Sequence, residues 1–429
     1  MEQTTNRYHS VRLDVTRCKG CTNCLKHCPT EAIRVRDGRA HIIDERCIDC
    51  GECIRICPHH AKRAHSSKME ELQGFRYNVA IPAPALFGQF NGLDNLDYVL
   101  TGLKKIGFDS VFEVSRAAEL VSEATRRLIK ENKLKKPIIS SACPAVVRLI
   151  KIRFPELCDN VLPLLAPIEV AAKIARAEAM EASGLSSEEI GVFFITPCPA
   201  KVTEIHSPNC IEKSQVNGAI AISSIYPELA HVMDHLDISE VEPIAQSGLL
   251  GIGWATSGGE AAAMLGDKYL AADGIENVIR VLEELEDERI HDVEFIELNA
   301  CAGGCVGGVL TVENPYVAQA RIHNLRKYLP VSLNHIEGRS IDDMCWSDEL
   351  TFDADIFRLD EDLGKAMEMM TRLESIYGDL PKLDCGSCGA PTCRALAEDI
   401  VKGKAKETDC IHKLKAKIQI VYDQLKNTI

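Results

Sequence analysis

Two closely spaced cysteine runs near the start of the chain constrain its fold more than any other feature. Both follow the pattern C-x2-C-x2-C-x3-C-P, and their cysteines are Cys18, Cys21, Cys24 and Cys28, then Cys47, Cys50, Cys53 and Cys57. Three thiolates at this spacing can hold one face of a 4Fe-4S cubane, while the fourth, displaced cysteine reaches across to a second cluster. The runs therefore predict two clusters with crossed ligand sets, namely Cys18, Cys21, Cys24 with Cys57, and Cys47, Cys50, Cys53 with Cys28.

Zinc is the alternative metal for these runs. Zinc sites, however, favour C-x2-C pairs that are separated by longer intervals, which neither run has. Residues 10 to 65 resemble a bacterial two-cluster ferredoxin, and this resemblance implies electron transfer. We therefore predict a ferredoxin-like α+β domain over residues 1–70.

The whole chain uses cysteine in a way that favours metal binding over disulfides. It has 19 cysteines in 429 residues, whereas disulfide-dense proteins are usually small and secreted. The first residues, MEQTTNRYHSVRLD, lack the apolar core of a signal peptide, and no apolar stretch approaches a membrane span. The formal net charge of −14 argues against nucleic acid or an anionic membrane as the main partner. We expect a cytoplasmic protein that is not inserted in a membrane.

The central region, residues 75–345, predicts a mostly parallel α/β sheet. Apolar strand-like runs (RYNVAIPAP, KPIISSACP, GVFFITPCP, VEFIELNAC) alternate with helical stretches such as residues 167–185. Ligands of such sheets collect beyond the carboxyl ends of the strands. Three of the four strand ends carry a cysteine, and a fourth cysteine follows one turn after the last of them. One buried cysteine is usually only a small apolar residue, but four on one face of a sheet favour a ligand site. These four are Cys143, Cys198, Cys301 and Cys305.

The segments SSACP, TPCPAK and ELNACAGGCVGG, together with ATSGGEAAAM, resemble the active-site motifs of iron-only (FeFe) hydrogenases. The resemblance implies a two-lobed domain that oxidises H2 and reduces protons at an H-cluster. In that cofactor the four cysteines just named would hold a 4Fe-4S cubane, and Cys305 would also bridge to a two-iron subcluster with CO, cyanide and azadithiolate ligands. Lys201 would donate to a cyanide ligand, and Pro84 would line the two-iron site.

The sequence departs from the family pattern at positions that bear on rate. Ala142 stands where the family has a proton-relay cysteine, and Ala166 stands where it has a relay serine. Because a positioned acid–base group contributes a factor of about 10² to 10⁴, we expect slow turnover. Thr196 and Asn299 replace two methionines and make the pocket more polar. The combination resembles the branch of the family to which a sensory role is assigned.

Three ionisable residues near the motifs are candidates for a substitute proton path. They are Glu169, His206 and Cys210. For Cys210 an ordinary buried or surface thiol is the favoured interpretation.

The C-terminal region, residues 346–429, predicts an acidic connector, a helix near residues 365–378 and a further cluster. The cysteines of this last site are Cys385, Cys388, Cys393 and Cys410, and the last two would flank the helical segment CRALAEDIVKG. Zinc competes on spacing alone. The segment DCGSCGAPTC resembles the 4Fe-4S segment of corrinoid iron–sulfur proteins and of the Rnf-complex ferredoxin-like subunit, which favours a 4Fe-4S cluster. The remaining cysteines, Cys158, Cys210 and Cys345, are unassigned.

Taken together, these features predict a hydrogenase that relays electrons through 4Fe-4S clusters to ferredoxin or to a redox signalling partner. The first alternative is a non-catalytic sensor of H2 or redox state, which the loss of the relay at Ala142 favours. The second resembles the cytosolic iron–sulfur assembly factors that share this fold but lack the two-iron subcluster. Lys201 and the additional C-terminal motif count against the second alternative.

Overall fold

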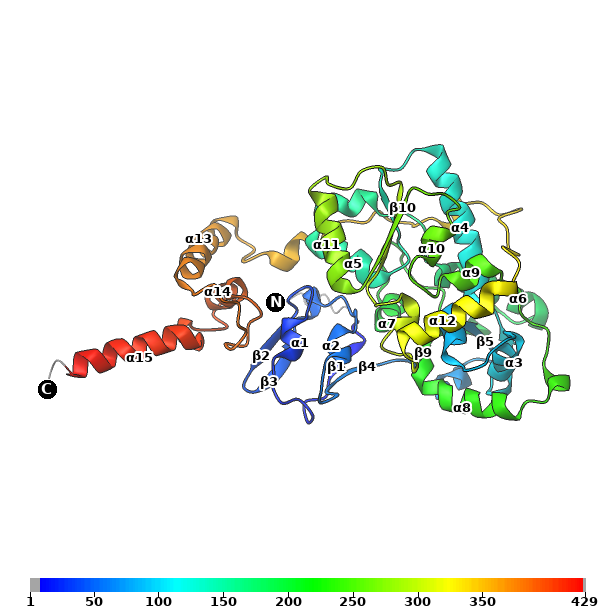
Figure 1. Cartoon of the computed structure of the whole chain (residues 1–429), viewed down its shortest axis with the longest axis horizontal. Coiled ribbons are helices and arrows are strands. Elements are labelled where there is room, and N and C mark those ends of the chain that lie inside the picture. The colour runs from blue at the N-terminus through cyan, green and yellow to red at the C-terminus, as the bar shows by residue number, and fades with distance from the viewer. Residues whose placement is uncertain (1–7, 427–429) are drawn as a thin grey trace. The chain divides into compact units, whose positions relative to one another are not determined.

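The computed structural model describes residues 8–426, which form two compact units (Figure 1). The first unit comprises the chain up to Val11, the short segment Ile48–Gly51, and Ala64–Phe352. The second comprises Arg12–Cys47, Glu52–Arg63 and the chain from Asp353 onward. The boundaries expected at residues 70, 75 and 345 stay a prediction, and residues 1–7 of the expected first domain lie outside the described residues.

A four-stranded parallel sheet lies at one side of the first unit. Its order is β6-β5-β8-β9, and the strands are β5 (Tyr77–Pro82), β6 (Ser110–Val111), β8 (Ile190–Thr196) and β9 (Gly218–Ala221). Both faces are covered, which explains the near-continuous apolar sequence of the central strands.

Successive residues of β5 pack into different cores, as the twofold alternation of a strand requires. Val79 and Ile81 pack with α4 (Val114–Glu131) and α6 (Pro167–Ser183). Ala80 faces the other way and packs with α3 and α8, whose bounds are Asp97–Lys105 and Ile222–His235.

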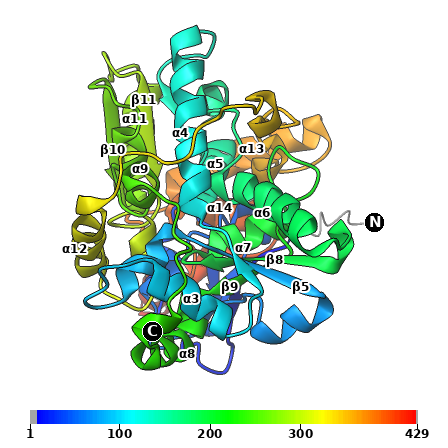
Figure 2. The same cartoon turned by 90° about the vertical axis from the view of Figure 1, so that its right-hand side faces the viewer.

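A second, three-stranded sheet completes the first unit. Its order is β10-β11-β7, all parallel, with β7 (Ile138–Ile139), β10 (Tyr269–Asp273) and β11 (Phe295–Asn299). Figure 2 shows α11 (Ile275–Glu286) beside β10 and β11. The other helices of the unit are α5 (Pro144–Arg153), α7 (Pro199–His206), α9 (Leu249–Gly253), α10 (Gly259–Ala262) and α12 (Pro315–Leu325).

The strands that precede the cysteines therefore belong to two sheets, and the expectation of one sheet was wrong on this point. β5 and β8 pair in the first sheet, whereas β7 and β11 pair in the second. Each strand carries its own apolar pattern, but that pattern does not identify its hydrogen-bonding neighbour. The expected two-lobed, mostly parallel fold is confirmed.

The short segment Ile48–Gly51 is tied into the first unit by a buried ionic cluster. The Asp49 carboxylate lies 2.8 Å from His9 Nδ1 and accepts a hydrogen bond from the Val11 amide at 3.0 Å. Arg148 is 1% exposed, lies 3.8 Å from Asp49, and donates to Glu204 at 3.0 Å. These contacts fix the position of Cys50, the next residue in the segment.

The second unit combines the ferredoxin-like segment with the C-terminal region. The former contains α1 (Asn23–Lys26), the antiparallel hairpin β2 (Ile33–Arg36) and β3 (Arg39–Ile42), and α2 (Glu52–Arg55). A two-stranded sheet pairs β1 (Val11–Leu13) with β4 (Lys62–Ala64).

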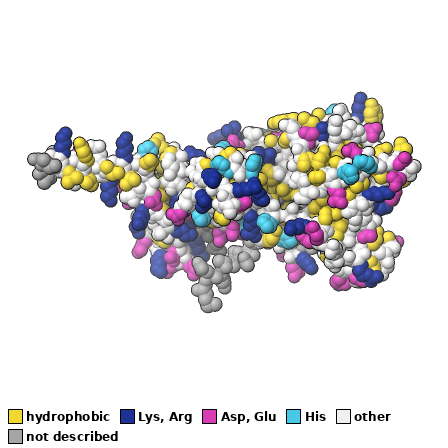
Figure 3. Space-filling view, turned by 90° about the horizontal axis from the view of Figure 1, so that it is seen from below, with side chains coloured by type: hydrophobic (Ala, Val, Ile, Leu, Met, Phe, Trp, Pro, Cys, Tyr) yellow, Lys and Arg dark blue, Asp and Glu magenta, His cyan; other side chains and the backbone are white. Residues whose placement is uncertain are grey.

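Three helices form most of the C-terminal region. They are α13 (Leu363–Asp379), α14 (Cys393–Val401) and α15 (Ile411–Lys426). The helices expected near residues 365–378 and after Cys393 are thereby confirmed. Apolar and lysine side chains of α15 lie on its surface (Figure 3), and Ile418 is 59% exposed. No helix within residues 8–426 is long and apolar enough to cross a membrane.

Replacement of Arg148 by methionine tests the ionic cluster around Asp49. The substitution removes the cation but keeps an apolar stem, so the buried Asp49 and the partly buried Glu204 are left without it. We expect the free energy of unfolding of the first unit to fall by about 3–5 kcal/mol, as when one partner of a buried ion pair is removed. Urea unfolding followed by tryptophan fluorescence measures this unit, because both tryptophans, Trp254 and Trp346, belong to it.

Lys105→Met is the matched control. Lys105 pairs with Glu240 at 2.9 Å on the surface, where both side chains are nearly half exposed. Exposed pairs contribute little, so this variant should unfold as the wild type does. Equal effects of the two substitutions would contradict the role assigned to Arg148.

Candidate active site and cluster sites

The four cysteines expected at strand ends lie around one cavity of the first unit. Cys143, Cys198, Cys301 and Cys305 line it together with Lys201. Cys198 follows β8 of one sheet, whereas Cys143 and Cys301 follow β7 and β11 of the other. The cavity has a volume of about 100 Å³, several times the roughly 10–15 Å³ that one water needs. It can therefore hold a group of many atoms.

Two of these cysteines stand at the beginnings of helices. Cys143 is the N-cap residue of α5 and Cys198 that of α7, and a proline occupies the first helical turn in each case. Proline fits there because the amide that it lacks would have no partner in the helix. The positive end of the helix dipole stabilises a thiolate or another anion at this position. The C-P sequence thus places two sulfur ligands where negative charge is favoured.

The buried thiols raise one another's pKa values. Burial, followed by the charge of Cys143, raises the pKa of Cys198 to about 11. Burial, followed by the charges of Cys198 and Cys143, raises the pKa of Cys305 to about 12, while the Lys201 charge acts in the opposite direction. Cys305 is open to the cavity although protein surrounds it. A bound metal cluster replaces thiol protons with positive charge, so this set of sulfur donors fits an iron–sulfur cofactor.

Close backbone contacts explain the glycines of the CAGGCVGG loop. Gly304 has φ +86°, and a Cβ atom there would lie 2.5 Å from the Ser257 backbone nitrogen. At Gly308 a Cβ atom would lie 2.2 Å from the Pro197 carbonyl oxygen. Only glycine allows both the positive φ and these approaches. The loop can therefore bring Cys301 and Cys305 to the same cavity.

The residues that depart from the family pattern are only partly in the cavity. Ala142, Pro84 and Asn299 line it. Thr196 does not line the cavity. Its hydroxyl accepts a hydrogen bond from the Cys198 amide at 3.1 Å. Ala166 is instead the N-cap residue of α6 and lines a smaller neighbouring pocket.

None of the three expected substitute proton carriers lines the cavity. Glu169 lines the smaller pocket, which Lys201 borders from the other side. The His206 ring packs on Tyr8 with 4.3 Å between ring centroids. The backbone carbonyl of Cys210 accepts hydrogen bonds from Ser347 and Asp348, away from the four cysteines.

Two buried carboxyl groups, missed by the sequence analysis, do line the cavity. Burial, followed by the negative charge of Glu297, raises the pKa of Glu260 to about 8. The Ser140 hydroxyl donates to Glu260 at 2.6 Å. Burial also raises the pKa of Glu297, but the Gly258 and Ala261 amides donate to its carboxylate at 3.0 and 2.8 Å. We therefore assign the charge to Glu297 and the proton to Glu260.

A signal for these two residues was present in the sequence. Glu297 interrupts the apolar strand β11, and a glutamate between buried apolar residues needs a reason. Its partner Glu260 follows the glycines of ATSGGEAAAM. Nothing in the spacing of the two shows that they meet, because the contact is long-range.

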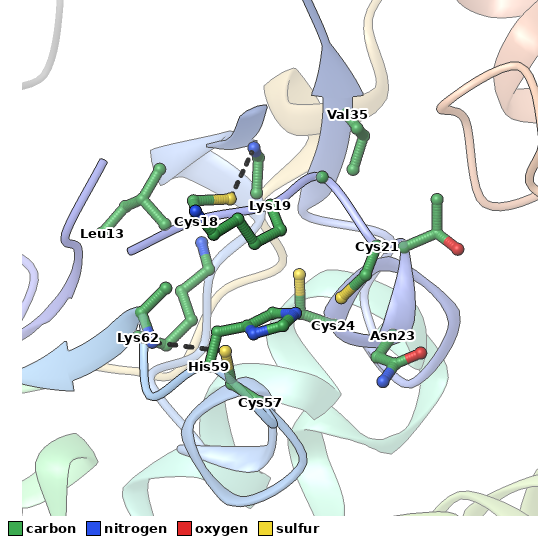
Figure 4. Close-up of a pocket in the computed structure, with 14 residues that line it drawn as sticks. Leu13, Cys18, Lys19, Cys21, Asn23, Cys24, Val35, Cys57, His59 and Lys62 are labelled. Atoms are coloured by element: carbon green, nitrogen blue, oxygen red, sulfur yellow. Dashed lines mark hydrogen bonds between the residues drawn. The ribbon is translucent and has the colours of Figure 1, made fainter. Parts of the chain in front are cut away.

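In the second unit, the first expected ferredoxin-type set lines one pocket. Figure 4 shows Cys18, Cys21, Cys24 and Cys57 around it, with Lys62 beside them. Lys62 is 2% exposed, and its ammonium group has no hydrogen-bond partner within the described residues. A buried unpaired cation is costly, and an anionic cluster on these four sulfurs would compensate it. The pocket therefore fits a 4Fe-4S cluster.

The second expected set is divided between the two units. Cys28, Cys47 and Cys53 lie in the second unit, and Cys50 lies in the segment Ile48–Gly51 of the first. Cys50 lines the large cavity there. Burial raises the pKa of Cys53 well above its ordinary value, with the Cys47 charge next in size.

Three of the four C-terminal cysteines lie in one small core. Cys393 and Cys410 are buried in it with Leu373 and Leu396, and Cys388 packs against them. Burial raises the pKa of Cys388. The charges of Cys385 and Cys410 act in the same direction, which places both near it. Cys385 is exposed. The structure thus brings together the cysteines that the spacing grouped.

Comparisons with known proteins agree with this arrangement. The family described as "Iron only hydrogenase large subunit, C-terminal domain" matches residues 76–266 and 256–309. A 4Fe-4S dicluster domain matches residues 10–58, and an Fe-S cluster family matches residues 380–412.

The individual relatives are hydrogenases and an iron–sulfur protein. The chain is 28% identical over 365 residues to the periplasmic Fe hydrogenase large subunit of Nitratidesulfovibrio vulgaris, covering 71% of this chain and 86% of that protein. It is 26% identical over 378 residues to iron hydrogenase 1 of Clostridium pasteurianum, covering 72% of this chain and 66% of that protein. A 41-residue segment is 51% identical to the corrinoid/iron-sulfur protein large subunit of Moorella thermoacetica, 10% of this chain and 9% of that one.

A solved structure of the FeFe-hydrogenase HydA1 from Chlamydomonas reinhardtii aligns at a TM-score of 0.48 and 15% identity, covering 66% of this chain and 97% of that chain. The family match spans more than half of the residues and includes all four cysteines of the large cavity. The chain therefore belongs to the iron-only hydrogenase large-subunit family, with an H-cluster and 4Fe-4S clusters as its cofactors.

Proposed function

We propose that this chain catalyses reversible H2 oxidation and proton reduction, at a low rate set by its unusual proton path. The observation that carries the proposal is the cavity in which four thiols, Lys201 and a buried carboxyl pair meet. When bound, the H-cluster supplies the site at which H2 is split or formed. The residues of the chain hold this group, exclude water from it and move protons to and from it.

We assign the ligand and binding roles as follows. Cys143, Cys198, Cys301 and Cys305 hold the cofactor, and the helix starts at the first two favour its negative charge. Lys201 presents an ammonium group, a donor of three hydrogen bonds, to anionic ligands in the cavity. Pro84 and Ala142 form part of the wall, and Ala142 carries no proton.

Glu260 and Glu297 replace the missing relay in this proposal. A carboxyl group with a pKa of about 8 holds its proton near neutral pH and can both give and take it. Ser140 orients the Glu260 carboxyl group, and Glu297 provides a neighbouring acceptor that backbone amides keep charged.

Electron exchange is assigned to the 4Fe-4S clusters. Cys50, which the sequence motif assigns to a ferredoxin-type cluster, lines the same cavity as the active-site thiols. We propose ferredoxin or a redox signalling protein as the partner, and a cytoplasmic location.

A second candidate is a sensor of H2 in which turnover is incidental. Ala142 favours it, because the usual relay to the cavity is absent. In a sensor the bound group still responds to H2, whereas steady turnover stays slow even when proton supply is improved.

Infrared spectroscopy tests the proposed active site directly. Anaerobic protein matured with a synthetic two-iron precursor should show CO and cyanide bands that shift under H2, because the two-iron subcluster would carry these ligands and 4Fe-4S clusters do not. The Cys305→Ala variant, which removes the proposed bridge, should lack them. Absence of the bands in wild-type protein with intact 4Fe-4S clusters would leave an iron–sulfur carrier instead.

Glu260→Gln tests the proton path. The amide keeps the shape of the side chain but cannot release a proton, so H2 evolution should fall by about 10² to 10⁴, the contribution of a positioned acid–base group. The infrared bands should remain, which shows that the site is still assembled. Glu169→Gln is the control, and it should retain activity. The reverse result would move the proton path to Glu169.

The pKa of Glu260 also predicts how stability depends on pH. The folded state keeps the proton up to about pH 8, whereas the unfolded chain loses it near 4.5. Folding therefore takes up a proton between these values, and stability falls as pH rises through this window. In wild-type protein that lacks the two-iron subcluster, the urea midpoint of unfolding should decrease as pH rises from about 4.5 to 8. The slope should be smaller in Glu260→Gln, and an identical slope would contradict the raised pKa.

A further inference from the structure

The C-terminal region of the second unit is joined to the ferredoxin-like segment by buried ion pairs. Asp399 on α14 accepts hydrogen bonds from Arg34 at 2.8 Å and from Arg36 at 2.6 Å. The side chains of Asp399 and Arg34 are only 8% and 7% exposed. A neighbouring pair joins Arg46 to Glu398. Buried ion pairs fix geometry, because separation of the partners leaves uncompensated charges.

Backbone contacts place the C-terminal cysteine loop directly on β2. The Val35 amide donates to the Gly389 carbonyl at 2.8 Å, and Arg36 donates to the Cys388 carbonyl at 2.6 Å. Gly389 has φ +80°, and a Cβ atom there would lie 1.9 Å from the Val35 carbonyl oxygen. The approach is therefore as close as two backbones allow.

Val35 of β2 also faces the first ferredoxin-type pocket. Val35 lines that pocket with Cys18, Cys21 and Cys24 (Figure 4). Lys26, at the end of the helix that carries Cys24, donates to the Asp384 carbonyl at 2.9 Å. One residue thus touches the loop of Cys388 on one side and the pocket of Cys18 on the other.

We propose that these contacts hold the C-terminal thiol set and the Cys18 set as one electron-transfer pair, in series. Each set has one exposed cysteine, Cys21 in the first and Cys385 in the second. Each transfer moves one electron from the reduced cluster to the oxidised one, with no bond made and no proton moved. The inference rests on the proposed function only in taking both sites to hold 4Fe-4S clusters.

An alternative role for the module is a structural one, in which its cluster only stabilises the fold. Such a cluster needs no fixed position relative to the first pocket. A structural cluster would also allow any side of the module to lie on β2. In this chain the side that contacts β2 is the loop that carries Cys388. The contacts of Val35, Arg36 and Lys26 all reach the segment 384–389 that carries two of the cysteines.

Electron paramagnetic resonance tests the pair in the full chain. Protein that carries its 4Fe-4S clusters but no two-iron subcluster is reduced stepwise with titanium(III) citrate. Cys388→Ala identifies the C-terminal signal by its loss. We expect this signal in the wild type to be split or broadened by magnetic coupling once the Cys18-type cluster is also reduced. Because H2 chemistry is not involved, the outcome is independent of hydrogenase activity.

Charge reversal at the interface tests what holds the pair. Asp399→Arg faces Arg34 and Arg36 with a like charge and should abolish the coupling while iron and sulfide contents stay at the wild-type level. Glu374→Arg is the matched control. It makes the same charge change in the same module, but at an exposed pair with Arg394, and should leave the coupling intact.

Two results would overturn the proposal. One is a wild-type spectrum without coupling when both clusters are reduced, and the other is unchanged coupling in Asp399→Arg with full iron content. If Asp399→Arg loses iron, Asp399→Asn takes its place. The milder variant should weaken the coupling, and an unaltered spectrum with full iron content counts against the proposal.

Discussion

The need to balance buried negative charge shapes the large cavity and the first ferredoxin-type pocket. Thiolates and anionic clusters cannot be buried without nearby positive charge or oriented amides. The large cavity has Lys201 and the starts of α5 and α7, and the first ferredoxin-type pocket has the buried ammonium group of Lys62. The carboxylate of Glu297 obeys the same rule through two backbone amides. Fold and chemistry are therefore set by one electrostatic requirement.

The sequence predicted the parts of this arrangement that depend on local spacing. Candidate ligands such as Cys143 and Cys198 follow strands and precede prolines, so a motif of a few residues places them at the start of a helix. The C-x2-C runs work in the same way. Two-lobed α/β topology followed from the alternation of strand-like and helical segments, and the resemblance to hydrogenases added the cofactor.

What the sequence did not predict depends on contacts between distant segments. Glu260 and Glu297 form a pair only because α10 packs against β11. The division of the strands into two sheets, and the contact of Asp399 with Arg34, are of the same kind. A single sequence gives the character of each segment but not its neighbour. His206 and the other predicted proton carriers lie near the motifs along the chain but outside the cavity, because nearness in sequence does not determine long-range contacts.

The buried cluster around Asp49 has a consequence for how the protein can be divided. His9, Asp49 and Arg148 lie far apart in the chain, yet all three belong to the unit that carries the large cavity. The unit that carries the large cavity is therefore not one continuous stretch of the chain. An excision at residue 75 would remove Asp49, one of the two acidic partners of Arg148, along with the ferredoxin-like segment. A stable minimal version would have to retain the segment from His9 to Val11 and the Ile48–Gly51 segment, or carry an apolar replacement for Arg148.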